Sequence, residues 1–188
     1  MNSCGFHERT QTYLSCFYEI LGEMIRGMCS AELTDSVSQN FIVQMIPHHR
    51  AAIEMSRNVL NYTTLAPLRQ IASRIITEQT QSIQDMEAAL CACSTMENTQ
   101  LCREEYLRRF QEITRTMFTR MGTACATNQI SANFMREMIP HHRGAIQMSE
   151  SALRCPVCPE LKPILQAIIT SQKAGVREME CLLRRITR

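Results

Sequence analysis

The sequence contains no tryptophan, and aromatic residues make up only 5% of its 188 residues. Few side chains are therefore available to stack on bases. The formal net charge is +2, and the Lys and Arg residues form no basic block. We expect no nucleic-acid partner. No apolar run approaches the roughly 20 residues of a membrane-spanning helix, so no membrane span is expected either.

Residues 1–18 lack the basic cluster and apolar stretch of a signal peptide. If the chain is complete, we expect a cytoplasmic location with reduced cysteines. If a leader has been removed, we expect a periplasmic or extracellular location, where the ten cysteines could form disulfides.

Two motifs of metal enzymes are also absent. No Glu has a His three residues later, as di-iron enzymes of the ferritin-like class require. The His-Glu-x-x-His pattern of zinc hydrolases does not occur. We recognise no catalytic constellation and do not expect an enzyme.

What the chain does contain is an internal duplication. A shift of 93 residues aligns the chain with itself without a gap, and about two fifths of positions 13–90 are identical to their partners. The block Met-Ile-Pro-His-His-Arg occurs in both copies. We predict a first module at residues 1–93, a linker at 94–104 and a second module at 105–188. Residues 93–100 are polar, and we expect them to be loose.

Apolar residues recur at helical spacing, and no alternating pattern or hairpin turn indicates a strand. The fold class is therefore all-α, with three helices in each module, at 10–28, 38–60 and 67–90 in the first. Ser38 and Ser131 are suitable N-cap residues for the two central helices. Pro47 lies inside the central helix and removes one backbone hydrogen bond, which favours a kinked helix over one that breaks at Ile46.

A helical wheel places His48 and His49 beside the centre of the apolar stripe of the central helix, whereas Arg50 falls on the opposite face. A lone buried histidine is usually hydrogen-bonded within the protein. An adjacent pair that recurs as His141 and His142 is costly to bury, because each ring nitrogen needs a partner. The repeated pair favours metal ligation.

Soft sulfur side chains are abundant, with 13 Met and 10 Cys. Methionine commonly fills irregular cores, so composition alone favours packing. Five methionines nevertheless recur in both modules, while core neighbours such as Ile25, replaced by Phe118, have changed. The predicted metal ligands are the histidines and the repeated methionines of both modules: Met24, Met28, Met45, His48, His49, Met55 and Met86, and their equivalents Met117, Met121, Met138, His141, His142, Met148 and Met179.

The cysteines do not repeat between the modules. Cys155 and Cys158 form a Cys-x-x-Cys motif in the second module alone, and Cys91, Cys93 and Cys102 cluster near the linker. Such a motif can be redox-active or bind metal. No second motif completes a zinc site, so an independent cysteine site is the less favoured interpretation.

The pattern Phe41-x-x-x-Met-Ile-Pro-His-His-Arg-x-Ala-Ile-x-Met55, followed by Ile75-Ile76-x-x-Gln79 and Met86, resembles the domain-of-unknown-function 305 family. Residues 134–148 and 168–179 match the same pattern. The resemblance implies a ferritin-like helical bundle, and some members are exported copper-binding proteins. The family usually has Asp where this chain has Ser38 and Ser131, so an acidic ligand there is lost.

We therefore predict a protein that binds a soft metal ion, most favourably Cu(I), through Met and His for buffering or resistance. The alternative is a structural or partner-binding helical protein without metal. The modules could pack through their histidine-bearing helices about a pseudo-two-fold axis, or form two separate bundles. We favour the packed version because it buries more apolar surface. Self-association through helical faces stays open.

Overall fold

A computed structural model describes residues 5–187 of the chain. Residues 1–4 and Arg188, at the ends of the two predicted modules, lie outside this range. Residues 5–187 form six helices and no strand, which confirms the all-α fold class. The helices are α1 (Glu8–Cys29), α2 (Val37–Leu60), α3 (Ala66–Ser94), α4 (Gln100–Gly122), α5 (Ile130–Ala152) and α6 (Leu161–Ile186). Within the described range, no helix is long and apolar enough to cross a membrane.

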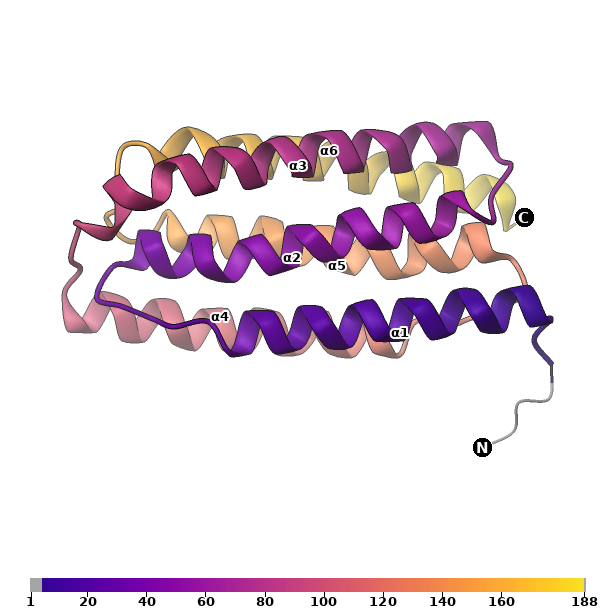
Figure 1. Ribbon diagram of the computed structural model, residues 1–188, viewed down its shortest axis with the longest axis horizontal. Helices are drawn as coiled ribbons and strands as arrows, with labels where there is room; N and C mark the ends of the chain where they lie inside the picture. The colour runs from indigo at the N-terminus through magenta and orange to yellow at the C-terminus, as the bar shows by residue number, and fades with distance from the viewer. Residues whose placement is uncertain (1–4, 188) are drawn as a thin grey trace.

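The two modules pack into one bundle, as the packed alternative predicts. The helices run side by side along the long axis, with α2 and α5 between the α1/α4 pair and the α3/α6 pair (Figure 1). Helix α2 packs against α1, α3 and α5, and α5 packs against α4, α6 and α2. The two histidine-bearing helices are therefore the centre of the molecule, and their apolar stripes are buried on several sides.

Neither central helix begins where its serine predicts. Helix α2 begins at Val37, and its N-cap is Ser36, whose hydroxyl accepts a hydrogen bond from the backbone N–H of Gln39 (3.2 Å). Helix α5 begins at Ile130. The N-cap prediction for Ser38 and Ser131 is wrong because both residues lie inside the first turn and their hydroxyls bond elsewhere.

Those hydroxyls join the two modules in a reciprocal way. Ser38 accepts a hydrogen bond from the backbone N–H of Cys158 (2.9 Å), in the loop before α6. Ser131, its equivalent, lies 2.8 Å from the hydroxyl of Thr63, in the loop before α3. Each central helix thus contacts the other module's loop, as a two-fold relationship requires.

Both internal prolines are accommodated without ending a helix. Helix α2 continues through Pro47 and α5 continues through Pro140, so the alternative of two short helices is wrong. The first module has a glycine opposite Pro47: a Cβ on Gly27 would lie 2.8 Å from the proline Cβ. Helix α1 can therefore approach α2 closely at this point.

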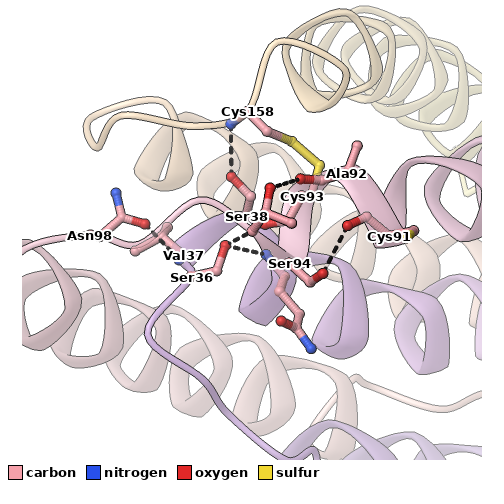
Figure 2. Close-up of a disulfide and its surroundings, with 11 residues drawn as sticks. Ser36, Val37, Ser38, Cys91, Ala92, Cys93, Ser94, Asn98 and Cys158 are labelled. Carbon is pink, nitrogen blue, oxygen red and sulfur yellow. Dashed lines mark hydrogen bonds between the residues drawn. A yellow bond between two sulfur atoms is a disulfide. The ribbon is translucent and has the colours of Figure 1, made fainter.

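The connection between the modules is more ordered than its polar composition predicts. The side-chain amide of Asn98 accepts a hydrogen bond from the backbone N–H of Val37 and donates one to the carbonyl of Pro156, both at 2.8 Å. Ser36 donates to the carbonyl of Cys93 (2.7 Å), as Figure 2 shows. These bonds hold the linker against the start of α2 and the loop before α6.

Two disulfides reinforce this end of the bundle. Cys93 pairs with Cys158, with a Cα–Cα distance of 5.4 Å (Figure 2), and Cys102 pairs with Cys155 at 6.1 Å. Both cysteines of the Cys-x-x-Cys motif are therefore bonded to cysteines at the linker. Each bond crosses from one predicted module, or its linker, to the other, and so adds a covalent restraint to their packing.

Candidate metal centre

The four predicted histidine ligands lie in the interior of the bundle. His48, His49 and His141 have no exposed surface, and His142 is 3% exposed. The opposite face of α2 carries Arg50, which is exposed and forms an ion pair with Glu87 at 3.4 Å. The equivalent Arg143–Glu180 pair is also on the surface, at 2.5 Å. The helical wheel therefore predicts the buried and the solvent-exposed faces of the central helices correctly.

The histidines form a continuous row across the α2–α5 contact. The rings of His48 and His141 lie against each other, with centroids 3.7 Å apart and planes inclined by 31°. The centroid of His49 lies 5.8 Å from that of His48, and the centroid of His142 lies 5.9 Å from that of His141. Sequence-equivalent residues thus occupy equivalent positions around one central pair.

Hydrogen bonds identify which ring nitrogens remain free. The Nε2–H of His141 donates to the backbone carbonyl of His48 (3.1 Å), since a carbonyl oxygen can only accept. The lone pair of a neutral His141 is then on Nδ1. Nε2 of His49 lies 3.2 Å from the hydroxyl of Ser82. Within the described chain, five fully buried ring nitrogens have no hydrogen-bond partner: Nδ1 and Nε2 of His48 and Nδ1 of His49, His141 and His142.

Burial keeps these rings neutral. It lowers the pKa of His49 to about 3 and that of His141 to about 4, because a charged ring would lose its hydration. The pKa values of His48 and His142 are also well below the ordinary range, first through burial and then through the charge of neighbouring rings. Neutral imidazole is the form that ligates a metal ion.

The repeated methionines lie in the buried core and come from all six helices. All ten are at most 2% exposed: Met24, Met28, Met45, Met55, Met86, Met117, Met121, Met138, Met148 and Met179. One sulfur is located closely: a Cβ on Gly144 would overlap Sδ of Met117. Gly144 lies one helical turn after His141 and one turn before Met148, so Sδ of Met117 lies against α5 at a point between these two residues.

The histidine nitrogens alone do not form a three-ligand site. Among the described residues, the one group of at least three His, Cys, Asp or Glu ligand atoms that all lie within 4.8 Å of one another is Cys93, Cys158 and Glu160. Its two cysteines are already joined in a disulfide. A centre with three or more ligands at the histidine row would therefore need further donors, which the buried methionines could supply.

A cleft between α3 and α6 leads from the surface to the histidine row. It has a volume of about 390 Å³, and His49 and His142 are among its lining residues. Gln79 and Gln172, which are equivalent under the 93-residue shift, line it as well. They are 4% and 3% exposed, and their Oε1 atoms have no hydrogen-bond partner within the described chain. The histidine row is thus buried, but two of its members line a cleft that opens to the surface.

Sequence reasoning missed a second pair of reciprocal contacts between the two modules. The hydroxyl of Tyr13 donates to the buried carboxyl of Glu137, and that of Tyr106 donates to the amide oxygen of Gln44 (2.9 Å). Both tyrosines and both acceptor positions are equivalent under the shift. Burial raises the pKa of Glu137 to about 7. The repeated tyrosine was visible in the sequence, but its partner lies in the other module.

The fold is a duplicated all-α bundle whose two central helices carry four buried histidines, and ten repeated methionines are also buried in its core. A family model described as "Domain of unknown function (DUF305)" matches residues 22–90 and, in an overlapping match, residues 38–183. The chain belongs to this family. No curated protein matches the chain.

Two solved structures share the fold. The "DUF305 fragment from Deinococcus radiodurans" is 25% identical, with a TM-score of 0.58, over 79% of this chain and 96% of that one. "CopM in the Ag-bound form (by soaking)" is 24% identical, with a TM-score of 0.59, over 81% of this chain and 98% of that one. The first structure is a member of the same family with a similar fold, and the second shows a similar fold alone.

Proposed function

We propose that the protein binds a soft monovalent metal ion, Cu(I) above all, through the buried histidine row and the methionines around it, for buffering or resistance. The observation that carries the proposal is the set of five buried histidine nitrogens without hydrogen-bond partners in the described chain. An unpaired buried polar group costs on the order of 1–3 kcal/mol. A ligated metal ion would satisfy several of them at once.

The composition of the donor set favours Cu(I) over Zn(II). Thioether sulfur is a soft ligand that prefers Cu(I), and imidazole accepts either ion. Methionine and neutral histidine contribute no negative charge. The same burial that lowers the pKa of His49 to about 3 opposes any positive charge at the site. Because the Born cost rises with the square of the charge, a divalent ion would cost about four times as much as a monovalent one.

The comparisons add a second line of support. Silver(I) is a soft monovalent ion, and the solved structure of CopM, which shares this fold, is described as Ag-bound by soaking. The family itself carries no assigned function. The proposal for this chain therefore rests on its own histidines and methionines.

We further propose that the protein works in an oxidising compartment, periplasmic or extracellular. Its two disulfides are the support, because such bonds persist outside the reducing cytosol. Mass spectrometry of the protein, alkylated at the moment of lysis, checks this. Both bonds should be intact, and modification of Cys93 and Cys158 by the alkylating reagent would contradict the proposal.

The decisive experiment is a metal titration of the full chain with its disulfides intact and its accessible thiols alkylated. Cu(I), maintained with a reductant that is not a thiol, should compete with a colorimetric chelator, whereas Zn(II) should bind far more weakly. Alkylation is needed because the exposed Cys29, Cys91 and Cys125 are themselves soft ligands. If the alkylated chain binds no Cu(I), the alternative of a structural or partner-binding helical protein replaces this proposal.

A further inference from the structure

We infer that the cleft between α3 and α6 is the path by which the metal ion reaches and leaves the histidine row, with the side-chain oxygens of Gln79 and Gln172 as its transient ligands. This inference rests on the proposed function. It concerns a part of the molecule that the metal ligands themselves do not explain.

The first support is the connection between the cleft and the row. His49 and His142 are the outer members of the histidine row, and both line the cleft. The inner pair, His48 and His141, does not line it. An ion that entered here would meet one histidine from each module before it reached the stacked pair.

The second support is the unpaired amide oxygens. Each glutamine is more than nine-tenths buried, and neither Oε1 has a partner among the described residues. Leaving two such groups unpaired in the interior is unfavourable. Ile75 and Ile168, also equivalent under the shift, line the same cleft beside them. The two amide oxygens would replace part of the hydration that a cation loses as it moves inward.

The third support is the charge at the cleft. Its acidic lining residues are Glu78 and Asp85, and no Lys or Arg is among the described residues that line it. A cleft lined by one sign of charge attracts ions of the other sign and raises their local concentration. Amide oxygen is a poor permanent ligand for Cu(I). The lining therefore suits passage of a cation better than its storage.

The two sides of the path differ at one point. Ser82, on α3, hydrogen-bonds to His49, but its equivalent on α6 is Gly175. A Cβ on Gly175 would lie 3.1 Å from Cδ2 and 3.2 Å from Nε2 of His142, so the ring lies directly against the helix backbone. The ring of His49 thus has a hydroxyl beside it on α3, whereas the ring of His142 has the backbone of α6.

A blocked cleft should slow exchange without changing affinity. Ala167 is exposed and lines the cleft, so Ala167→Trp should fill its mouth without entering the core. Ala88 is exposed on α3 and does not line the cleft, so Ala88→Trp is the matched control. Cu(I) release is followed into excess chelator, at concentrations where the rate no longer depends on the chelator. We expect Ala167→Trp to slow release at least tenfold, with Kd within twofold of the parent, and Ala88→Trp to change neither.

A second variant tests the glutamines. Gln79→Leu/Gln172→Leu removes two unpaired oxygens and should leave thermal stability equal or higher. It should also slow release. Parent-like release rates in both the tryptophan and the leucine variants, with intact affinity, would overturn the path alone. A loss of affinity in Ala167→Trp larger than its loss of rate would also overturn it, because the cleft would then hold the ion. Absence of Cu(I) binding by the parent would overturn the proposed function itself.

Discussion

The Nε2 atom of His141 lies 3.1 Å from the backbone carbonyl oxygen of His48, its own equivalent in the other module. One hydrogen bond therefore joins the two central helices at the middle of the histidine row and defines the protonated nitrogen of His141. Both ring nitrogens of His48 lack a partner within the described chain. The row is close to symmetric in position but not in hydrogen bonding.

This contact predicts the tautomer of His141. In the metal-free protein, ¹⁵N NMR of the imidazoles should give a neutral ring protonated on Nε2, because that nitrogen donates to His48. Since burial lowers the pKa of His141 to about 4, the ring should stay neutral at pH 6. On addition of Ag(I), the Nδ1 resonance should move. A shift at Nε2 instead would mean that the hydrogen bond to His48 breaks when metal binds.

The stacked pair also predicts that the modules share their metal. Replacing His48 and His49 with Leu should remove well over half of the bound Cu(I), because His48 lies against His141. The control is Arg50→Ala, which removes only a surface ion pair with Glu87. Stoichiometry is measured by elemental analysis of the folded, dialysed proteins. Loss of only half of the metal would indicate one independent site in each module.

Gly144 offers a test of one methionine. The first module has Ala51 at the equivalent position, but a Cβ on Gly144 would meet Met117, whose Cγ would lie 2.9 Å away. Gly144→Ala should therefore displace the Met117 thioether from its place against α5. We expect weaker Cu(I) binding, by about tenfold, with a stability loss of roughly 1–3 kcal/mol from overpacking. Ala51→Gly is the matched control, and equal effects of both changes on affinity would contradict this role of Met117.

Glu137 predicts a distinctive pH dependence. Its folded pKa of about 7 lies above the ordinary 4.5, so the folded state binds the proton more tightly than the unfolded state. The associated stability is complete below pH 4.5 and is lost as the pH rises through 7, to a total of about 3 kcal/mol. Gln44 occupies the equivalent position and bonds to Tyr106. Glu137→Gln should therefore remove this loss of stability at high pH without breaking the contact to Tyr13.

Urea unfolding of parent and variant at pH 5 and pH 8.5 measures this effect. The histidines act in the opposite direction: their folded pKa values are lowered, so their contribution is present above pH 6.5 and is lost as the pH falls. The pH dependence that the histidines contribute is the same in the parent and the variant. It therefore cancels in the difference between their free energies of unfolding. A difference that does not change with pH would mean that Glu137 stays ionised in the folded protein.

The disulfides should stabilise the fold because each closes a long loop and so restricts the unfolded chain. Cys93 and Cys158 are separated by 65 residues, and removal of a native disulfide typically costs about 2–5 kcal/mol. Cys93→Ala/Cys158→Ala should lower the free energy of unfolding by that amount, measured in urea. Cys29→Ala, at an exposed free cysteine, is the control and should have almost no effect. The double variant should still bind Cu(I), because neither cysteine belongs to the histidine row.

Helical periodicity is a local property, and the features that depend on it could be predicted from the sequence. The wheel separated buried His48 and His49 from exposed Arg50, and the duplication implied that the same separation holds for the second module. Helical periodicity could not predict which residues meet across the modules, because those contacts depend on how the apolar stripes of the two central helices pack against each other. Only the tertiary structure shows that Tyr13 hydrogen-bonds to Glu137. It also shows that the Ser38 hydroxyl bonds to the loop at Cys158 instead of capping its own helix, and that Gln79 and Gln172 line one cleft.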